Sequence, residues 1–470
     1  MKEKYKNLLN DTVIFAMGSL GSKVILFFLL PLYTNYLSTE EYGTADLITT
    51  LVTLIFPLVS LSIDLGVIRF GMKSNEKKED ILVNSIVVLL FSFVVMLLLI
   101  PIFNFYRVVA EWKLYLVVLI ALSNITEIEK VYLKVKNKNK AYSLIGILQT
   151  LILAGSNIVL LTFLNTGVKG YLLSNIAALS VCAIASFFAA DLHKDLRKGK
   201  YNFVLLKRMV VYSAPLVFSR ISWWLMHSFD KVLIEWMIGA SALGLYTAAT
   251  KIPSLVNVVT GVFNQAWSIS SIRESETTKD TNFYSKMFDY NSFVMFGVGI
   301  VIISVVKPLM SVYVGEAFRD SWVYVPLLLV SAICYSMFAF CGTLYVALQK
   351  SVNDMWTSVF AAIMNIIVNY VFIIKIGVWG AIIGSVASLL LFTIVRIIDI
   401  KRYIEFKIDI IRFIVNVILV LLLSLSVTIN FYPIIVSIIS ILLYIVINKK
   451  LVVFFGGIVI RRFRKKGRSC

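Results

Sequence analysis

Residues 81–105 read ILVNSIVVLLFSFVVMLLLIPIFNF, an uncharged run that is long enough to cross a lipid bilayer as one helix. A bilayer span needs about 20 mostly apolar residues, because a helix rises about 1.5 Å per residue through a hydrocarbon layer about 30 Å thick. Over all 470 residues, 59% belong to the hydrophobic set AVILMFWYC and only 15% are charged, against roughly 25% charged in soluble proteins. The chain is therefore predicted to be an all-α integral membrane protein.

Apolar runs of this kind recur along the whole chain. We predict fourteen transmembrane helices, or twelve if the last two runs do not span, near residues 12–33, 45–67, 81–105, 114–133, 142–164, 170–190, 210–235, 243–268, 289–313, 322–347, 355–374, 378–399, 410–429 and 432–448. The first run exceeds a signal-peptide core in length and lacks a small-residue cleavage site, so we expect it to stay as a helix. Too few polar residues remain for a soluble enzyme domain.

The basic residues set the expected orientation. The net charge of +19 comes from 45 Lys and Arg against 26 Asp and Glu. With a cytoplasmic N-terminus most of these cations, including Arg396 and the polybasic tail, face the cytoplasm. The predicted outer loops hold only Arg107, Lys113, Lys169, Arg319 and Lys375. This asymmetry follows the positive-inside rule, so both termini are predicted to be cytoplasmic, and the positive charge needs no nucleic-acid partner.

No motif in the sequence indicates enzyme chemistry. There is no P-loop, no Asp-rich metal motif and no Ser/His/Asp arrangement, and the four Cys and two His form no ligand cluster. We therefore predict a protein that is not an enzyme and that carries no metal or organic cofactor.

Two pairs of segments indicate an internal repeat. LSTEEYGTADLITTL (37–51) is echoed by IGASALGLYTAATKI (238–252), and NTGVKGYLLSN (165–175) by KIGVWGAIIGS (375–385). Six predicted helices separate the copies, so the repeat is parallel, and parallel repeats enclose a substrate site between two lobes. We predict an N-lobe at 1–208 with the inter-lobe linker, a C-lobe at 209–402, and two extra helices with a basic tail at 403–470.

Three cations inside the predicted helices have no partner nearby in the sequence. They are Lys23 in the first helix, Arg220 in the seventh and Lys251 in the eighth. A charge at the centre of a membrane helix costs about 2.5–3.5 kcal/mol on insertion scales, so such residues usually face a polar cavity. We predict that all three converge on one cationic cavity between the lobes and bind an anionic substrate.

Other charges have more local interpretations. Asp64 and Asp230 are the carboxylates best placed to couple transport to H⁺ or Na⁺, although Asp230 could instead neutralise its neighbour Lys231. Two helical pairs are also expected from their spacing, Lys231 with Glu235 and Glu127 with Lys130.

Two segments of the sequence resemble a known family. LLPLYTNYLSTEEYGTADLITTLVTLIFPLVSLSIDLGVIRF (29–70) and APLVFSRISWWLMHSFDKVLIEWMIGASALGLYTAATKIPSL (214–255) are similar to the polysaccharide-transporter branch of the MOP exporter superfamily. The resemblance implies a Wzx-type flippase of the bacterial cytoplasmic (inner) membrane. Such a protein moves undecaprenyl-pyrophosphate-linked oligosaccharides to the outer leaflet for O-antigen, capsule or exopolysaccharide assembly. It further implies membrane lipids, a polysaccharide polymerase and a chain-length regulator as partners.

Two alternative functions stay open from the sequence. A cation-coupled multidrug exporter of the same superfamily would be expected to hold unpaired carboxylates, whereas the central charges here are mostly positive. A membrane polysaccharide polymerase would be expected to carry a large outer loop, and the predicted outer loops are short.

Overall fold

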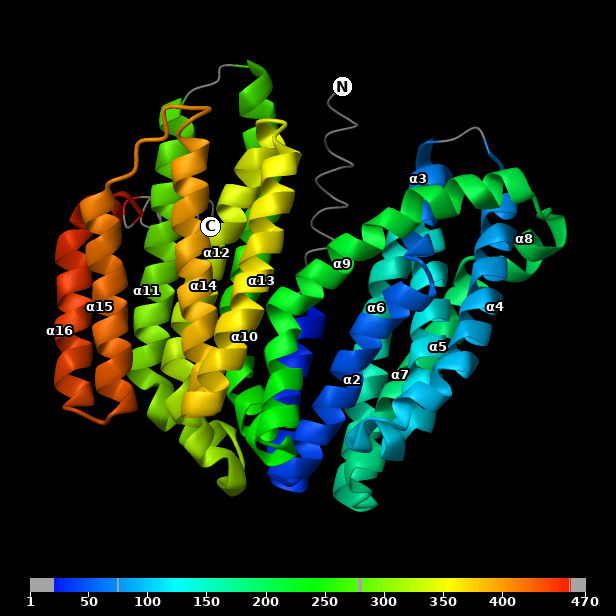
Figure 1. Cartoon of the computed structure of the whole chain (residues 1–470), viewed down its shortest axis with the longest axis horizontal. Coiled ribbons are helices and arrows are strands. Elements are labelled where there is room, and N and C mark those ends of the chain that lie inside the picture. The colour runs from blue at the N-terminus through cyan, green and yellow to red at the C-terminus, as the bar shows by residue number, and fades with distance from the viewer. Residues whose placement is uncertain (1–20, 74–75, 278–280, 456, 458–470) are drawn as a thin grey trace, which may run out of the picture. The chain divides into compact units, whose positions relative to one another are not determined.

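The computed structural model describes residues 21–73, 76–277, 281–455 and 457, and every regular element within these ranges is a helix. The all-α membrane fold predicted from the sequence is confirmed. After a helical stretch at residues 21–36, the elements shown in Figure 1 are α2 (Thr39–Val59), α3 (Ile63–Lys73), α4 (Lys78–Phe103), α5 (Arg107–Val135), α6 (Asn139–Asn157), the π-helix η1 (Ile158–Phe163), α7 (Gly167–Ala189), α8 (Leu192–Lys198), α9 (Phe203–Met237), α10 (Ala240–Thr277), α11 (Thr281–Tyr313), the 3₁₀-helix η2 (Glu316–Tyr324), α12 (Val325–Ala347), α13 (Ser351–Ile376), α14 (Val378–Ile400), α15 (Ile410–Thr428) and α16 (Pro433–Ile447).

Ten helices in the described part of the chain are long and apolar enough to cross a membrane, or eleven if α16 and the helix bent by 81° after it form one span. The long helices α9 and α10 are not among the ten, and α9 alone carries six charged residues. The first predicted helix begins among residues 1–20, which lie outside the described residues. The count of fourteen is consistent with these helices and stays a prediction.

The helix predicted over 45–67 is wrong, because the structure breaks it into α2 and α3. Leu61 and Ser62 adopt left-handed backbone angles, with φ of 51° and 50°, a region that costs a non-glycine residue about 1–2 kcal/mol. The Ser60 hydroxyl donates to the carbonyl of Phe56 within the last turn of α2. Ser60, Ser62 and Asp64 interrupt the apolar run at this point, but single polar residues also occur inside unbroken helices, so the prediction treated 45–67 as one helix.

The connection predicted as a polar linker at 191–208 is largely helical. It contains α8 and the first turns of α9. Lysines that precede α6 bind the end of α7 here: the Lys136 Nζ donates to the carbonyl of Ala190, and the Lys138 Nζ donates to that of Ala189, both at 2.8 Å. Cations at a helix C-terminus satisfy its free carbonyls and oppose its dipole. Some cations that set the predicted topology therefore also hold helix ends.

Asp191 lies at this same junction, between the two helices α7 and α8. Its carboxylate accepts hydrogen bonds from Lys138 at 2.8 Å and Lys194 at 3.1 Å. The hydrogen bond from Lys138, and then the one from Lys194, holds the pKa of Asp191 below its usual range. The carboxylate is therefore ionised at any pH above the ordinary range for aspartate.

The chain divides into two compact units, residues Met1–Thr247 and Ala248–Cys470. These units reflect packing, whereas the lobes were inferred from the repeat, so the lobe boundaries at 208 and 402 stay predictions. The first unit has a core of interlocking apolar side chains from α3, α4, α5 and α9, among them Ile63, Leu82, Tyr132 and Met209. In the second unit, α12 is the most enclosed helix and packs closely against α14.

The two turns of the first sequence echo lie against each other within the first unit. A Cβ atom on Gly43 would lie 2.0 Å from the carbonyl oxygen of Ala240, and one on Gly244 would lie 1.9 Å from that of Thr39. Ala240 is the equivalent of Thr39, and Gly244 of Gly43, each 201 positions further along the chain (240 − 39 and 244 − 43), so the contact is reciprocal. Each turn needs a glycine because the other copy's backbone occupies the space of a side chain.

Candidate substrate-binding site

A cavity of about 430 Å³ lies among α2, α3, α5 and α9 in the first unit. Its lining is mostly apolar, and the polar side chains are Thr53, Glu127, Ser219 and Arg220. A cavity of this size falls within the range of small-molecule sites. Arg220 therefore lines a cavity within the first unit.

Arg220 forms a two-pronged ion pair with Asp64 of α3. Its Nη1 donates to Oδ1 at 3.1 Å and its Nη2 to Oδ2 at 2.5 Å. The Asp64 side chain is 4% exposed, whereas that of Arg220 is 27% exposed. A guanidinium has five N–H donors, and among the described residues Asp64 accepts from two of them. The other three N–H donors of Arg220 are available to a ligand, because Arg220 lines the cavity.

The break between α2 and α3 brings Asp64 to this position. Asp64 lies in the first turn of α3, where the helix dipole favours a carboxylate. The opposite wall is fixed by Trp224, one turn after Arg220, whose Nε1 donates to the carbonyl of Thr50 and the hydroxyl of Thr53, both at 3.1 Å. These contacts hold α9 against α2 and so orient the guanidinium.

A second polar cluster joins α2, α9 and the start of α10. The carboxylate of Asp46 accepts from the Lys231 Nζ at 2.7 Å and from the Thr247 hydroxyl at 3.1 Å. The neighbouring Asp230 accepts from the hydroxyl of Tyr246 and from the backbone N–H of Lys231 at 2.9 Å. Every carboxylate in this cluster has hydrogen-bond donors around it, which lowers the cost of burying it.

Both helical pairs expected from spacing are wrong. Lys231 reaches across to Asp46 on α2, and the Glu235 Oε2 has no hydrogen-bond partner among the described residues. The Lys130 Nζ donates to Gln149 at 3.3 Å, while Glu127 lines the cavity beside Arg220. Spacing along a helix shows which residues are close enough to form an ion pair. Here Lys231 and Lys130 bond instead to residues of neighbouring helices.

The other two predicted substrate-binding cations, Lys23 and Lys251, do not line the Arg220 cavity. Lys23 is exposed, on the helical stretch 21–36 of the first unit, and Lys251 is half-buried on α10 in the second unit. Their convergence with Arg220 stays a prediction. Arg220 has no partner nearby in the sequence, but Asp64, 156 residues away, pairs with it.

The chain matches the family model described as Polysaccharide biosynthesis protein over residues 8–269. The matched region includes the whole Arg220 cavity and the Asp46 cluster. The chain belongs to this family.

A curated relative matches about half of the chain. The chain is 22% identical, over 266 residues, to the Lsg locus putative protein 1 of Haemophilus influenzae. The match covers 54% of this chain and 64% of that relative.

Solved structures share the fold over most of the chain. The lipid II flippase MurJ in an inward closed conformation has a TM-score of 0.71 at 15% identity, covering 95% of this chain and all of that one. An inward-facing multidrug-resistance MATE transporter of the MOP superfamily has a TM-score of 0.68 at 14% identity, covering 80% and 92%. A Pyrococcus furiosus MOP transporter, described as having a binding pocket of reversed polarity, has a TM-score of 0.59 at 15% identity, covering 83% and 95%. These neighbours are flippases and transporters rather than enzymes, in agreement with the prediction.

Three charged residues, Asp46, Glu127 and Arg396, lie in the interior of the protein or line the cavity, although the sequence predicted no such role for them. Asp46 lies inside the helix predicted over 45–67 and two turns inside α2, but no role was predicted for it. Glu127 was assigned to a structural pair. Arg396 was counted among the cytoplasmic cations, although it is 1% exposed on α14. Asp46 and Arg396 could have been suspected, because both lie inside predicted membrane helices.

The described residues contain no group of three or more His, Cys, Asp and Glu side chains that could hold a metal ion. The chemistry available at the Arg220 cavity is therefore charge and hydrogen bonding: N–H donors from one guanidinium, hydroxyls from Ser219 and Thr53, and the carboxyl group of Glu127.

Proposed function

We propose that this protein is a flippase for undecaprenyl-pyrophosphate-linked oligosaccharide repeat units. It would carry them from the cytoplasmic to the outer leaflet of a bacterial inner membrane for surface polysaccharide assembly. The observation that carries the proposal is the guanidinium of Arg220 at a cavity of the helical bundle. Two of its five N–H donors bond to Asp64, and no other described residue accepts from it. Family membership and the fold shared with a lipid II flippase support it.

The geometry suits a phosphate ligand. Asp64 uses two donors of Arg220 and fixes the plane of the guanidinium, so little side-chain freedom is lost when a ligand binds to the remaining donors. Charge-assisted hydrogen bonds to a phosphate are roughly twice as strong as neutral ones. Lys23 and Lys251 would add point charges in the complete site, and the lipid tail would stay in the bilayer.

The transport cycle would be alternating access between an inward-open and an outward-open state. The basic segments, including the polar connection near α8, would face the cytoplasm with both termini. We further propose that a polysaccharide polymerase and a chain-length regulator use the flipped product, since a repeat unit on the outer leaflet must still be polymerised.

Deletion of the gene tests this function. In a strain without a second flippase, we expect lipid-linked repeat units to accumulate facing the cytoplasm and surface polymer to be lost. Plasmid-borne wild type should restore the polymer, and normal polymer in the deletion strain would refute the proposal.

Glu127 favours a second candidate, a cation-coupled multidrug exporter. It places a carboxyl group at the same cavity as Arg220, and unpaired carboxylates suit cationic drugs. If this candidate is correct, overexpression would raise resistance to lipophilic cations, Glu127→Gln would abolish that resistance, and the deletion strain would keep its polymer.

Coupling to an ion gradient is a separate part of the proposal. Asp64 and Asp230 are the proposed carriers of H⁺ or Na⁺, and Lys231 would stay charged beside Asp46. Transport by Asp64→Asn should lose its response when the proton and sodium gradients are varied. An unchanged response would remove Asp64 from the coupling mechanism.

A further inference from the structure

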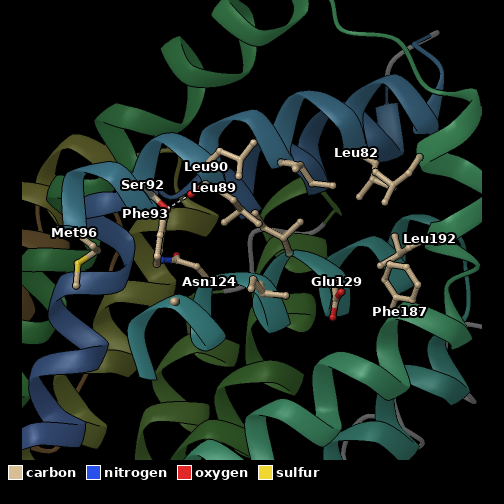
Figure 2. Close-up of a pocket in the computed structure, with 15 residues that line it drawn as sticks. Leu82, Leu89, Leu90, Ser92, Phe93, Met96, Asn124, Glu129, Phe187 and Leu192 are labelled. Carbon is tan, nitrogen blue, oxygen red and sulfur yellow. Dashed lines mark hydrogen bonds between the residues drawn. The ribbon is translucent and has the colours of Figure 1, made fainter. Parts of the chain in front are cut away.

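A second pocket, of about 350 Å³, lies in the first unit among α4, α5, α7 and α8. Figure 2 shows Leu89, Leu90 and Phe93 along one wall and Phe187 and Leu192 at one end. None of its fifteen lining residues is Lys, Arg or His, and it shares no residue with the Arg220 cavity. The flipping mechanism therefore makes no use of this pocket.

Two buried polar side chains of α5 enter this apolar lining. Asn124 is 4% exposed and Glu129 is 8% exposed, and both line the pocket (Figure 2). The Oδ1 of Asn124 and the Oε2 of Glu129 accept no hydrogen bond from the described residues. Glu129 also forms no ion pair with any described cation. Buried acceptors normally have partners, and two unpartnered acceptors in one pocket indicate a ligand that supplies donors.

We propose that this pocket binds a hydrophobic amine. Its ammonium group would donate to the Glu129 carboxylate, and its hydrocarbon chain would lie along Leu89, Leu90 and Phe93. Asn124, about 7.5 Å from Glu129 along the axis of α5, is a secondary acceptor for a polar group further along the chain. The proposal is independent of the flipping function.

The charge of the lining decides between an amine and other amphiphiles. A phospholipid or other phosphate-bearing amphiphile would place its phosphate beside a carboxylate with no lining cation to offset the repulsion. An alcohol could donate to Glu129, but a charge-assisted hydrogen bond to an ammonium is roughly twice as strong as a neutral one. The carboxylate and the ammonium would also neutralise each other in a site of low polarity.

Binding of radiolabelled decylamine to the full-length protein in phosphatidylglycerol nanodiscs tests the proposal, with decanol as the neutral isostere and empty nanodiscs as background. We expect saturable binding of decylamine, and binding of decanol at least about tenfold weaker. Glu129→Gln should weaken decylamine binding at least about tenfold and leave decanol unchanged. Leu89→Trp, which fills the pocket, should abolish binding of both probes. Glu111→Gln, an exposed acid on the same helix outside the lining, is the matched control and should bind as wild type.

Four results would overturn the assignment. Glu129→Gln with wild-type affinity, or decanol as tight as decylamine, would show that charge plays no part. Displacement of decylamine when phosphatidylethanolamine is added to the nanodiscs would make this a phospholipid site. A folded Leu89→Trp protein that still binds decylamine would place the amine outside this pocket.

Discussion

Two arginines inside membrane helices pair with aspartates, and they differ in how completely their donors are used. Arg396 on α14 is 1% exposed and donates five hydrogen bonds, to Thr357, Ser358, the carbonyl of Phe338, and both the carbonyl and the carboxylate of Asp354. Arg220 is 27% exposed and donates to Asp64 alone among the described residues. The Arg396 guanidinium bonds to four residues of α12 and α13 and so holds these helices together. The Arg220 guanidinium bonds to one described residue beside a cavity and keeps donors that can bind a ligand.

The surroundings of each arginine reinforce this difference. The Arg396 guanidinium lies 3.5 Å from the centre of the Phe338 ring, and a Cβ on Gly342 would come within 2.7 Å of its Nη1. Gly342 is therefore needed to leave room for the charge. The Arg220 guanidinium lies 5.7 Å from the Phe56 ring beside an open volume of about 430 Å³. Close packing and cavity lining are the physical signs of the two roles.

The largest expected effect is the loss of stability in Arg396→Ala. Removing one partner of a buried ion pair costs about 3–5 kcal/mol. We expect the lower end of this range, because the Asp354 side chain left behind is 35% exposed, while the bonds of the buried guanidinium to α12 and α13 are lost. We expect a much lower yield of folded protein and a strongly reduced melting temperature in detergent, measured by fluorescence-detected size-exclusion chromatography after heating. A wild-type melting temperature would mean that Arg396 is not structural.

Double variants separate structure from function at the two arginines. Arg396→Met with Asp354→Leu removes both charges, and such replacements are often neutral or stabilising, so stability and surface polymer should both largely return. Arg220→Met with Asp64→Leu should likewise fold, yet it should restore no polymer in the deletion strain. If the Arg220 double variant supports wild-type polymer levels, the cavity arginine does not bind the substrate.

Asp64→Asn should have an intermediate effect, mainly on function. The amide can still accept one hydrogen bond from Arg220, so we expect a stability loss of only about 1–2 kcal/mol. Transport should fall by about tenfold or more, because the guanidinium is no longer held in one orientation. Asp354→Asn is the matched change beside Arg396, where transport should follow the amount of folded protein. Equal transport per folded molecule in both variants would contradict the distinction.

Lys23 should show the smallest effect on stability. Its side chain is exposed, so Lys23→Ala should change stability by no more than about 0.5 kcal/mol. If Lys23 contributes to the cationic site, polymer production should nevertheless be crippled, and Lys23→Arg should retain more activity because charge matters more than shape there. The readout is polymer length on gels, normalised to protein level. Full-length polymer from Lys23→Ala would exclude Lys23 from the site.

The sequence by itself determined the fold class and most helix positions. Apolar runs located α4, α12 and α14 to within a few residues, because insertion into a bilayer depends on local hydrophobicity, a property that can be read residue by residue. The glycines of the two echoed turns were also visible, since Gly43 and Gly244 occupy equal places in each copy. Their direct contact was not visible in the sequence.

Only the tertiary structure decided which charges are paired. Asp64 and Arg220 are 156 residues apart, and Lys231 and Asp46 are 185 apart. The break at Leu61 and Ser62, which brings Asp64 to Arg220, lies among Ser60, Ser62 and Asp64, a pattern that a continuous helix can also contain. Arg396 was expected among the cytoplasmic cations and Arg220 at a cavity, but the sequence could not show that Arg396 bonds to four residues and Arg220, among the described residues, to one. The physical reason is that ion pairing depends on distances of about 3 Å between side chains of different helices, and hydrophobicity fixes where a helix lies without fixing its neighbours or its rotation.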